Sequence, residues 1–270
     1  MKSLKESIFS DVEDIANDDT TLFEQFLKVN YQIDGTYIIK NGVIDVMGDV
    51  RVKNKHIKSL TNGLFRFGIV QGVFYCGRCA ILKSLEGAPK EVGEHFDCSS
   101  CDSLISLEGA PKKVGGCFYC NECDDLKSLE GAPEKVGASF HCSGCLELTS
   151  LKGAPKEVGE GFYCYECPEL KSLEGAPKRV GGCFDCHDCI SLVSLEGAPG
   201  VVDKSFWCHS CPKLTSLEGS PEKVGGIFDC SYCKKLKSLK GAPKEVGGKF
   251  DYSGCKNLRL TDEDREKYSI

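Results

Sequence analysis

Apolar side chains recur along most of the chain in one fixed order, with polar residues between them. One copy of the pattern consists of Phe96, Cys98, Cys101, Leu104, Leu107 and Val114. The next copy begins at Phe118, so the period is 118 − 96 = 22, and it continues to Leu258 without an insertion. A fixed short period predicts stacked units, each too small to bury its own apolar face. We therefore expect one elongated, mostly β solenoid built from 22-residue rungs.

Each unit divides into a strand, a curl and a turn. Phe96 and Cys98 alternate with Asp97 and Ser99, which predicts a short strand with Phe and Cys facing the interior and the variable residues facing outward. The next Cys and Leu positions lie three residues apart, as expected for a chain that curls round a core. Residues 109–111, Gly-Ala-Pro, predict the outer turn, because Pro fixes φ and Gly tolerates unusual φ values.

Helix-capping signals lie near both ends of the chain. Ser3 with Glu6 and Thr21 with Glu24 fit capping boxes ahead of apolar residues at helical spacing, so we expect two N-terminal helices that cover the first rung. Thr261 precedes an acidic run and predicts a short N-capped helical turn that covers the last rung.

A hairpin and a degenerate rung lead into the repeats. Asn41-Gly42 between β-branched runs predicts a tight hairpin. Counting back one period from Phe74 and Cys76 gives Val52 and Asn54, which keep the pattern with other residues. The expected organisation is a helical cap at 1–36, a hairpin and degenerate first rung at 37–59, a solenoid at 60–260 and a C-terminal cap at 261–270.

Charge and composition limit the classes of partner. The net charge of −6 and the pI near 5.5 give no basic footprint for nucleic acid or for an anionic membrane. No apolar run is long enough to span a membrane, and the N-terminal residues lack the apolar core of a secretion signal. We expect a soluble protein of a reducing cytoplasm.

The 19 cysteines include eight Cys-x-x-Cys pairs, from Cys76/Cys79 to Cys230/Cys233. Such pairs can supply thiolates to zinc or to an iron–sulfur cluster. The same two columns, however, hold Asn54 and Ile57 at one end of the array and Tyr252 at the other, which favours packing. We therefore assign no metal ligand and no cofactor, although a metal- or redox-responsive thiol protein stays open as an alternative.

Disulfides between rungs are not expected either. Neighbouring parallel strands lie about 4.8 Å apart, whereas a disulfide requires Cβ atoms near 3.8 Å. Cys117 and Cys183 lie outside the pairs, in a variable column that we expect to face solvent. They are either incidental exposed thiols or redox sensors.

The residues that define the repeat resemble two known patterns. The run Cys101-Asp-Ser-Leu104-Ile-Ser-Leu107 resembles a leucine-rich repeat of the cysteine-containing and bacterial variants. The longer phrase Leu-x-Ser-Leu-Glu-Gly-Ala-Pro-Lys-x-Val-Gly-Gly-x-Phe-x-Cys is similar to repeat proteins encoded by bacteriophages and some bacteria. This resemblance implies a leucine-rich-repeat β solenoid whose exposed strand face binds a partner, and, for a phage protein, the host cytoplasm.

The outward strand positions are the candidate binding surface. The column next to the Phe column is Tyr75, Asp97, Tyr119, His141, Tyr163, Asp185, Trp207, Asp229 and Asp251. The column next to the first Cys is Gly77, Ser99, Asn121, Ser143, Tyr165, His187, His209, Ser231 and Ser253. Large polar-aromatic residues gather at Tyr163, Tyr165, Asp185, His187, Trp207 and His209, which we predict to contact a protein partner. The plainer alternative is that strands favour aromatic residues for cross-strand packing.

The hypothesis is a non-enzymatic protein–protein interaction module. No Ser or Cys nucleophile with a supporting pair is identifiable, so we assign no catalytic residue. A structural component of a virion or other assembly is a second possibility. The flank after the strands changes from acidic residues, such as Asp102 and Glu166, to lysines such as Lys213 and Lys256. This gradient either orients a partner of complementary charge or is a solvated rim.

Overall fold

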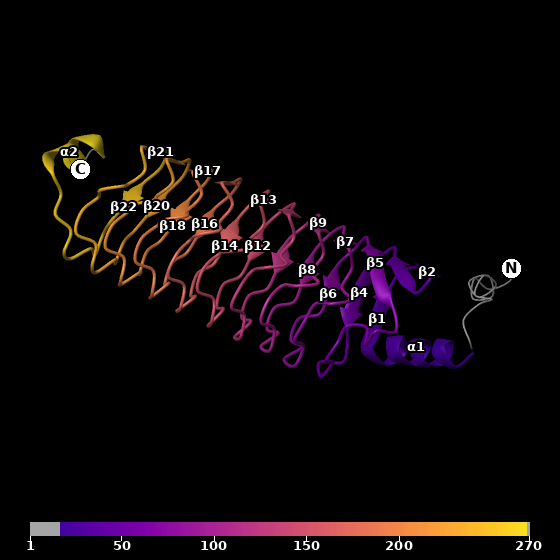
Figure 1. Ribbon diagram of the computed structural model, residues 1–270. Coiled ribbons are helices and arrows are strands. Elements are labelled where there is room, and N and C mark those ends of the chain that lie inside the picture. The colour runs from indigo at the N-terminus through magenta and orange to yellow at the C-terminus, as the bar shows by residue number, and fades with distance from the viewer. Residues whose placement is uncertain (1–16, 269–270) are drawn as a thin grey trace.

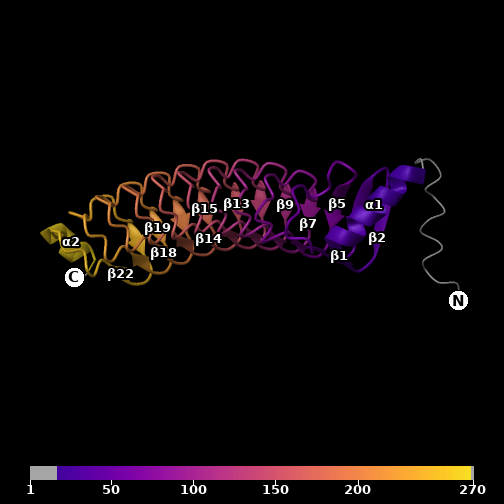
Figure 2. The same ribbon diagram turned by 90° about the horizontal axis from the view of Figure 1, so that it is seen from below.

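Each 22-residue unit forms one turn of a parallel β-solenoid in the computed structural model, which describes residues 17–268. Figures 1 and 2 show an elongated body with helix α1 (Asn17–Asn30) at one end and helix α2 (Asp262–Lys267) at the other. The predicted fold class, a mostly β solenoid with short helices at both ends, is confirmed. No helix within residues 17–268 has both the length and the apolar character needed to cross a lipid bilayer.

Two eleven-stranded sheets run along the body. Sheet A contains, in spatial order, β1 (Tyr31–Asp34), β4 (Asp49–Val52), β6 (Phe74–Tyr75), β8 (Phe96–Asp97), β10 (Phe118–Tyr119), β12 (Phe140–His141), β14 (Phe162–Tyr163), β16 (Phe184–Asp185), β18 (Phe206–Trp207), β20 (Phe228–Asp229) and β22 (Phe250–Asp251). Sheet B contains β2 (Tyr37–Lys40), β3 (Val43–Val46), β5 (Arg66–Val70), β7 (Glu91–Val92), β9 (Lys113–Val114), β11 (Lys135–Val136), β13 (Glu157–Val158), β15 (Arg179–Val180), β17 (Val201–Val202), β19 (Lys223–Val224) and β21 (Glu245–Val246).

The core consists of columns of identical side chains. In sheet A the strands pair in register, so that Phe118 lies between Phe96 and Phe140. Their rings are stacked with centroids 5.1 and 5.3 Å apart. The Phe, both Cys and both Leu positions of each complete rung between Phe96 and Cys233 are fully buried. The predicted interior face is therefore confirmed, and neighbouring rungs stabilise one another through these columns.

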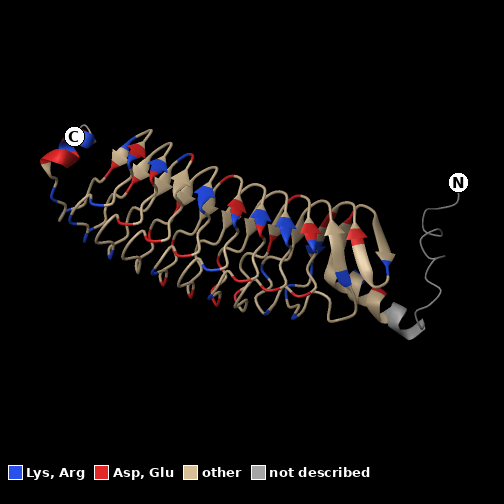
Figure 3. Cartoon of the chain, turned by 45° about the horizontal axis from the view of Figure 1, so that its top comes forward, with Lys and Arg blue, Asp and Glu red and all other residues tan. Residues whose placement is uncertain are grey.

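Sheet B was not anticipated as a sheet, and its outward face carries charge. Its strands from β7 to β19 contribute one buried Val and one outward residue each, and Figure 3 shows charged strands of both signs along it. Ion pairs join neighbouring rungs at Lys113–Glu91 (3.4 Å), Lys135–Glu157 (2.9 Å) and Lys223–Glu245 (2.8 Å). Exposed pairs contribute little to stability. They neutralise much of this face within the chain itself.

The N-terminal end differs from the sequence prediction in three places. Phe74 pairs with Val50 and not with Val52, so the spacing into the first standard rung is 74 − 50 = 24 residues. Within the described residues α1 spans Asn17–Asn30, so Thr21 lies inside the helix and is not its cap. The segment predicted to be helical through residue 36 contains β1, which pairs antiparallel with β4. The helix expected to begin near Ser3 lies outside the described residues. Phe23 packs edge-on against Phe65 at 5.2 Å, so α1 packs on an aromatic residue of the unit that follows the degenerate rung.

The hairpin and the C-terminal cap agree with the sequence. Strands β2 and β3 pair antiparallel around Asn41 and Gly42, whose φ values of 51° and 67° match the positive values of a type I′ turn. Thr261 caps α2 through a capping box with Asp264. The ring of Tyr268, just after α2, stacks on Phe250 of the last rung at 4.5 Å. That contact covers part of the last Phe ring.

Candidate functional site

Aromatic rings form a stack along the outward side of sheet A. His141 lies between Tyr119 and Tyr163, with ring centroids 4.7 and 4.6 Å apart. The three residues occupy equivalent positions on β10, β12 and β14, which pair in register. The spacing of parallel strands, about 4.8 Å, therefore sets the ring separation. We call these three residues the first stack.

A second stack lies beside the first, in the column next to the first Cys of each rung. His187 stacks on Tyr165 at 4.7 Å and on His209 at 4.6 Å. All three side chains are half-buried. Since the second stack begins where the first ends, the two form a stepped aromatic surface across several successive rungs. Stacking fixes the rings before any partner binds.

In the outward column that contains the first stack, some rungs carry an aspartate in place of an aromatic residue. These aspartates accept hydrogen bonds from the turn that follows the strand. Asp97 accepts hydrogen bonds from the backbone N–H of Ser99 (2.9 Å) and from its hydroxyl (2.6 Å). Asp185 accepts the backbone N–H of His187 at 3.1 Å and lies 2.7 Å from its Nδ1 atom. These are Asx turns, in which the side chain satisfies the backbone of the residue two positions on.

The structure divides the six predicted contact residues into two groups. Five rings are half-buried: Tyr163, Tyr165, His187, Trp207 and His209. Asp185 is only 7% exposed, contrary to the expectation that its column faces solvent, and its carboxylate is engaged by His187. Trp207 stands between Asp185 and Asp229 on neighbouring strands. It is therefore a ring set between two carboxylates.

A groove of about 240 Å³ lies beside the two stacks. It is lined by Tyr119, Asn121, Glu122, His141, Ser143, Gly144, Tyr165 and Glu166. In the outward column next to the first Cys, Asn121 and Ser143 are small and leave this space open, and Tyr165 closes one end of it. The sequence prediction omitted Tyr119 and His141, although both were visible in the same column. Their role depends on the groove, which only the three-dimensional structure shows.

Larger hollows lie elsewhere on the molecule. One of about 360 Å³ is on sheet B, among the charged residues around β11, β13 and β15. Another of about 600 Å³ lies where Tyr268 meets the last rungs. Both are lined in part by lysines and glutamates that form ion pairs, such as Lys135 with Glu157. The sheet A groove differs because its aromatic residues, Tyr119, His141 and Tyr165, come from three successive rungs of the outward face.

Partial burial changes the acidity of the first stack. Burial lowers the pKa of His141 to about 4, because the charged imidazolium loses solvation between two rings. Burial, followed by the neighbouring Cys117 thiol, raises the pKa of Tyr119 to about 12. Both rings are therefore neutral at physiological pH, and the stack presents dipoles without net charge.

The flank beside the stacks is acidic. The pKa of Asp102 is raised from its usual range, first by partial burial and then by the nearby carboxylates of Asp124 and Asp125. Toward the C-terminus the flank carries exposed lysines instead, among them Lys213 and Lys234. The predicted change of sign is present at the surface.

The cysteine columns are free thiols with a repeated hydrogen bond. No disulfide joins any of the 19 cysteines, all of which lie within the described residues. From Cys101 onward, the second thiol of each pair donates to the carbonyl oxygen of the first cysteine one rung earlier; for example, Cys145 donates to Cys120 at 3.3 Å. The same bond recurs from Cys101 to Cys255, at 3.2–3.4 Å. Burial raises the pKa of thiols such as Cys98 and Cys142 well above the usual value.

Comparisons with protein-family models, with curated proteins and with solved structures gave no match.

Proposed function

We propose that the chain is a non-enzymatic protein-binding solenoid of the leucine-rich-repeat type, of the kind encoded by phages and bacteria, and that sheet A binds its partner. One observation carries this proposal. Two aromatic stacks, Tyr119 to Tyr163 and Tyr165 to His209, lie side by side on the outward face and border a groove. Sheet B, by contrast, carries cross-rung ion pairs.

Rigid aromatic side chains suit a protein interface. Tyr and Trp are enriched among residues that dominate binding energy, and they supply large contact areas. A ring already fixed by stacking loses little conformational freedom when a partner binds. Tyr163 and Trp207 lie two rungs apart on one column, which corresponds to about 10 Å at the usual strand spacing. That distance matches contacts made by one segment of a partner.

The charge beside the groove favours a partner with basic residues. Glu122 and Glu166 line the groove, and further carboxylates such as Asp124 follow on the same flank. Complementary charge speeds association and fixes orientation more than it adds affinity. We therefore expect binding that weakens moderately with added salt.

Within this proposal the buried cysteines serve packing, and they are neither reactive nor metal-binding groups. A thiolate is the reactive and metal-binding form, and burial disfavours it. The thiols of the second cysteines in the pairs, such as Cys145 and Cys167, also donate hydrogen bonds to backbone oxygens.

The proposal is tested by separating the two sheet faces. The partner is identified by affinity capture with the intact chain from its native source, and binding is then measured with the purified partner. Tyr163→Ala combined with Trp207→Ala should weaken binding at least about tenfold, because such anchors contribute about 2 kcal/mol or more. Lys135→Ala with Glu157→Ala, which removes an ion pair on sheet B, is the matched control. If both double variants bind the partner with equal affinity, sheet A is not the partner-binding surface.

A further inference from the structure

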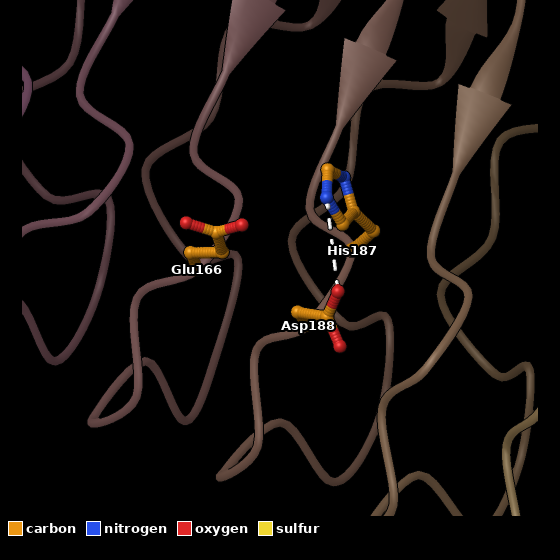
Figure 4. Close-up of side chains that lie close together, drawn as sticks. All are labelled: Glu166, His187 and Asp188. Carbon is orange, nitrogen blue, oxygen red and sulfur yellow. Dashed lines mark ion pairs between the residues drawn. The ribbon is translucent and has the colours of Figure 1, made fainter.

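Three potential metal-binding side chains converge at one edge of the second stack. Glu166, His187 and Asp188 each offer one ligand atom, and these atoms all lie within 4.8 Å of one another. Figure 4 shows Glu166 on one rung and the other two on the next. Within residues 17–268 this is the one such group of three or more His, Cys, Asp and Glu side chains. The cysteine columns form none.

The repeat itself brings the two carboxylates together. Glu166 and Asp188 occupy equivalent positions of neighbouring rungs, since 188 − 166 = 22, and both have left-handed φ values, 54° and 53°. The same turn conformation on adjacent rungs therefore points both side chains to the same side. The Asp188 side chain is 47% exposed and Glu166 is exposed, so each can change rotamer to approach an ion.

His187 is held in the orientation that a metal ligand needs. Its Nδ1 atom lies 2.7 Å from Oδ1 of Asp185, which is 7% exposed. An ionised carboxylate at this position accepts a hydrogen bond from a protonated Nδ1 and leaves the lone pair on Nε2. That Nε2 atom faces Asp188, 3.8 Å from Oδ2. Metal-binding histidines commonly show this arrangement, in which a carboxylate fixes the tautomer and increases ligand basicity.

We propose that Glu166, His187 and Asp188 bind one divalent first-row transition-metal ion, such as Zn²⁺ or Co²⁺, with water completing the coordination. Imidazole with carboxylates suits these ions, whereas Ca²⁺ and Mg²⁺ prefer oxygen ligands alone. Asp185 acts as a positioning residue through His187. The sequence assigned no metal ligand, because residues 166 and 187 become neighbours only when the rungs stack. The site does not depend on the proposed partner binding.

The test uses Co²⁺ with the reduced, full-length chain. Its ultraviolet–visible spectrum separates nitrogen and oxygen ligands from thiolates, which give an intense charge-transfer band in the near ultraviolet. We expect one equivalent of Co²⁺ to bind without that band, and Zn²⁺ to displace it. His187→Asn and Glu166→Gln should each remove most of the binding, and Asp185→Asn should weaken it about tenfold or more. His141→Asn, in the first stack, is the matched control and should bind Co²⁺ as the wild type does.

Several results would overturn the proposal. These are no binding at millimolar Co²⁺, a thiolate band, or equal affinity in the wild type and His187→Asn. Circular dichroism establishes that each variant keeps its fold. Because Glu166 is exposed, Glu166→Gln decides the matter if Asp185→Asn unfolds. Failure of partner binding in the sheet A variants would leave the Co²⁺ result unchanged, so the two proposals fail separately.

Discussion

A single backbone carbonyl explains why each rung carries a second cysteine. The carbonyl oxygens of Cys98 and Cys120 receive no backbone N–H within residues 17–268, and each is reached by the thiol of the next rung's second cysteine at 3.3 Å. A buried carbonyl without a donor costs free energy. Cysteine is small and apolar enough for the core and still donates a weak hydrogen bond.

Cys142 and Cys145, the two cysteines of one rung, should therefore differ in their response to alanine. Cys142 and Cys145 are both fully buried, but only Cys145 donates to a carbonyl within the described residues. Cys145→Ala should lower the free energy of unfolding by about 1–2 kcal/mol more than Cys142→Ala, because the Cys120 oxygen loses its donor. Urea unfolding of both variants measures the difference. Equal losses would show that the thiol contributes volume alone.

His141 should make stability depend on pH. Its pKa is about 4 in the folded chain against a usual value of 6.5, so the unfolded chain binds a proton at higher pH. The stabilisation is fully present above about pH 6.5 and is lost as pH falls toward 4. His141→Phe keeps a ring in the stack and removes this titration. We expect the free energies of unfolding of wild type and variant to diverge over that interval, and parallel profiles would contradict the assignment.

The burial of a side chain was predictable in the columns where the same residue repeats, and was not predictable in the columns where the residue varies. The repeated Phe and Cys positions alternate along a strand, so their burial followed from the period alone. Asp185 was expected to face solvent with the rest of its column, but it is 7% exposed and its carboxylate lies 2.7 Å from Nδ1 of His187. Such a contact depends on which residue stands two positions further on, and no periodicity encodes it.

Among the elements, the strands of sheet B were missed because past β5 they are two residues long. A strand such as β9 contains one buried Val, and a single apolar residue has no detectable period of two. Pairing with β7 and β11 defines it instead. The Asn41-Gly42 hairpin was predicted correctly, since its turn requires specific residues whatever the surroundings.

The outer turn requires glycine for two reasons. Gly131 has φ +90°, and a Cβ there would clash with the backbone nitrogen of Glu108 in the preceding rung. Gly131→Ala should lower the free energy of unfolding by about 2 kcal/mol or more, through left-handed strain and backbone displacement. Gly200→Ala is the matched control, because its Cβ would meet no atom closer than 3.7 Å. That change should be neutral or stabilise by about 0.4–1 kcal/mol. Similar losses in the two variants, measured by urea unfolding, would count against this explanation.

At the scale of the whole molecule, the unbroken period predicted the architecture, while the helical end of the chain had to be observed. The solenoid follows from the repeat, because every unit has the same apolar face and can pack on the unit next to it. The N-terminal end has no such repetition: α1 packs on Phe65, a residue in the stretch that replaces the usual turn sequence. The metal site needs contact between successive rungs, so a linear scan for ligand spacing did not find it.

The rungs should be removable as whole units. Sheet A has ten parallel strands after β1, each pairing only with its neighbours, so stability is approximately a sum of similar terms. Deleting Leu82–Ser103, which is one full period, joins Ile81 to Leu104 and restores every column. We expect this shortened chain to fold, with a urea m-value lower by about a tenth because less surface is exposed on unfolding. Deleting Leu82–Val92, which is half a period, moves Cys98 to the turn position of Gly87 and Cys101 to the exposed position of Lys90. The Cys columns then no longer match, which should prevent cooperative folding. If both deletions fold equally well, or neither folds, the rungs are not independent units joined by their columns; circular dichroism and urea titration distinguish these outcomes.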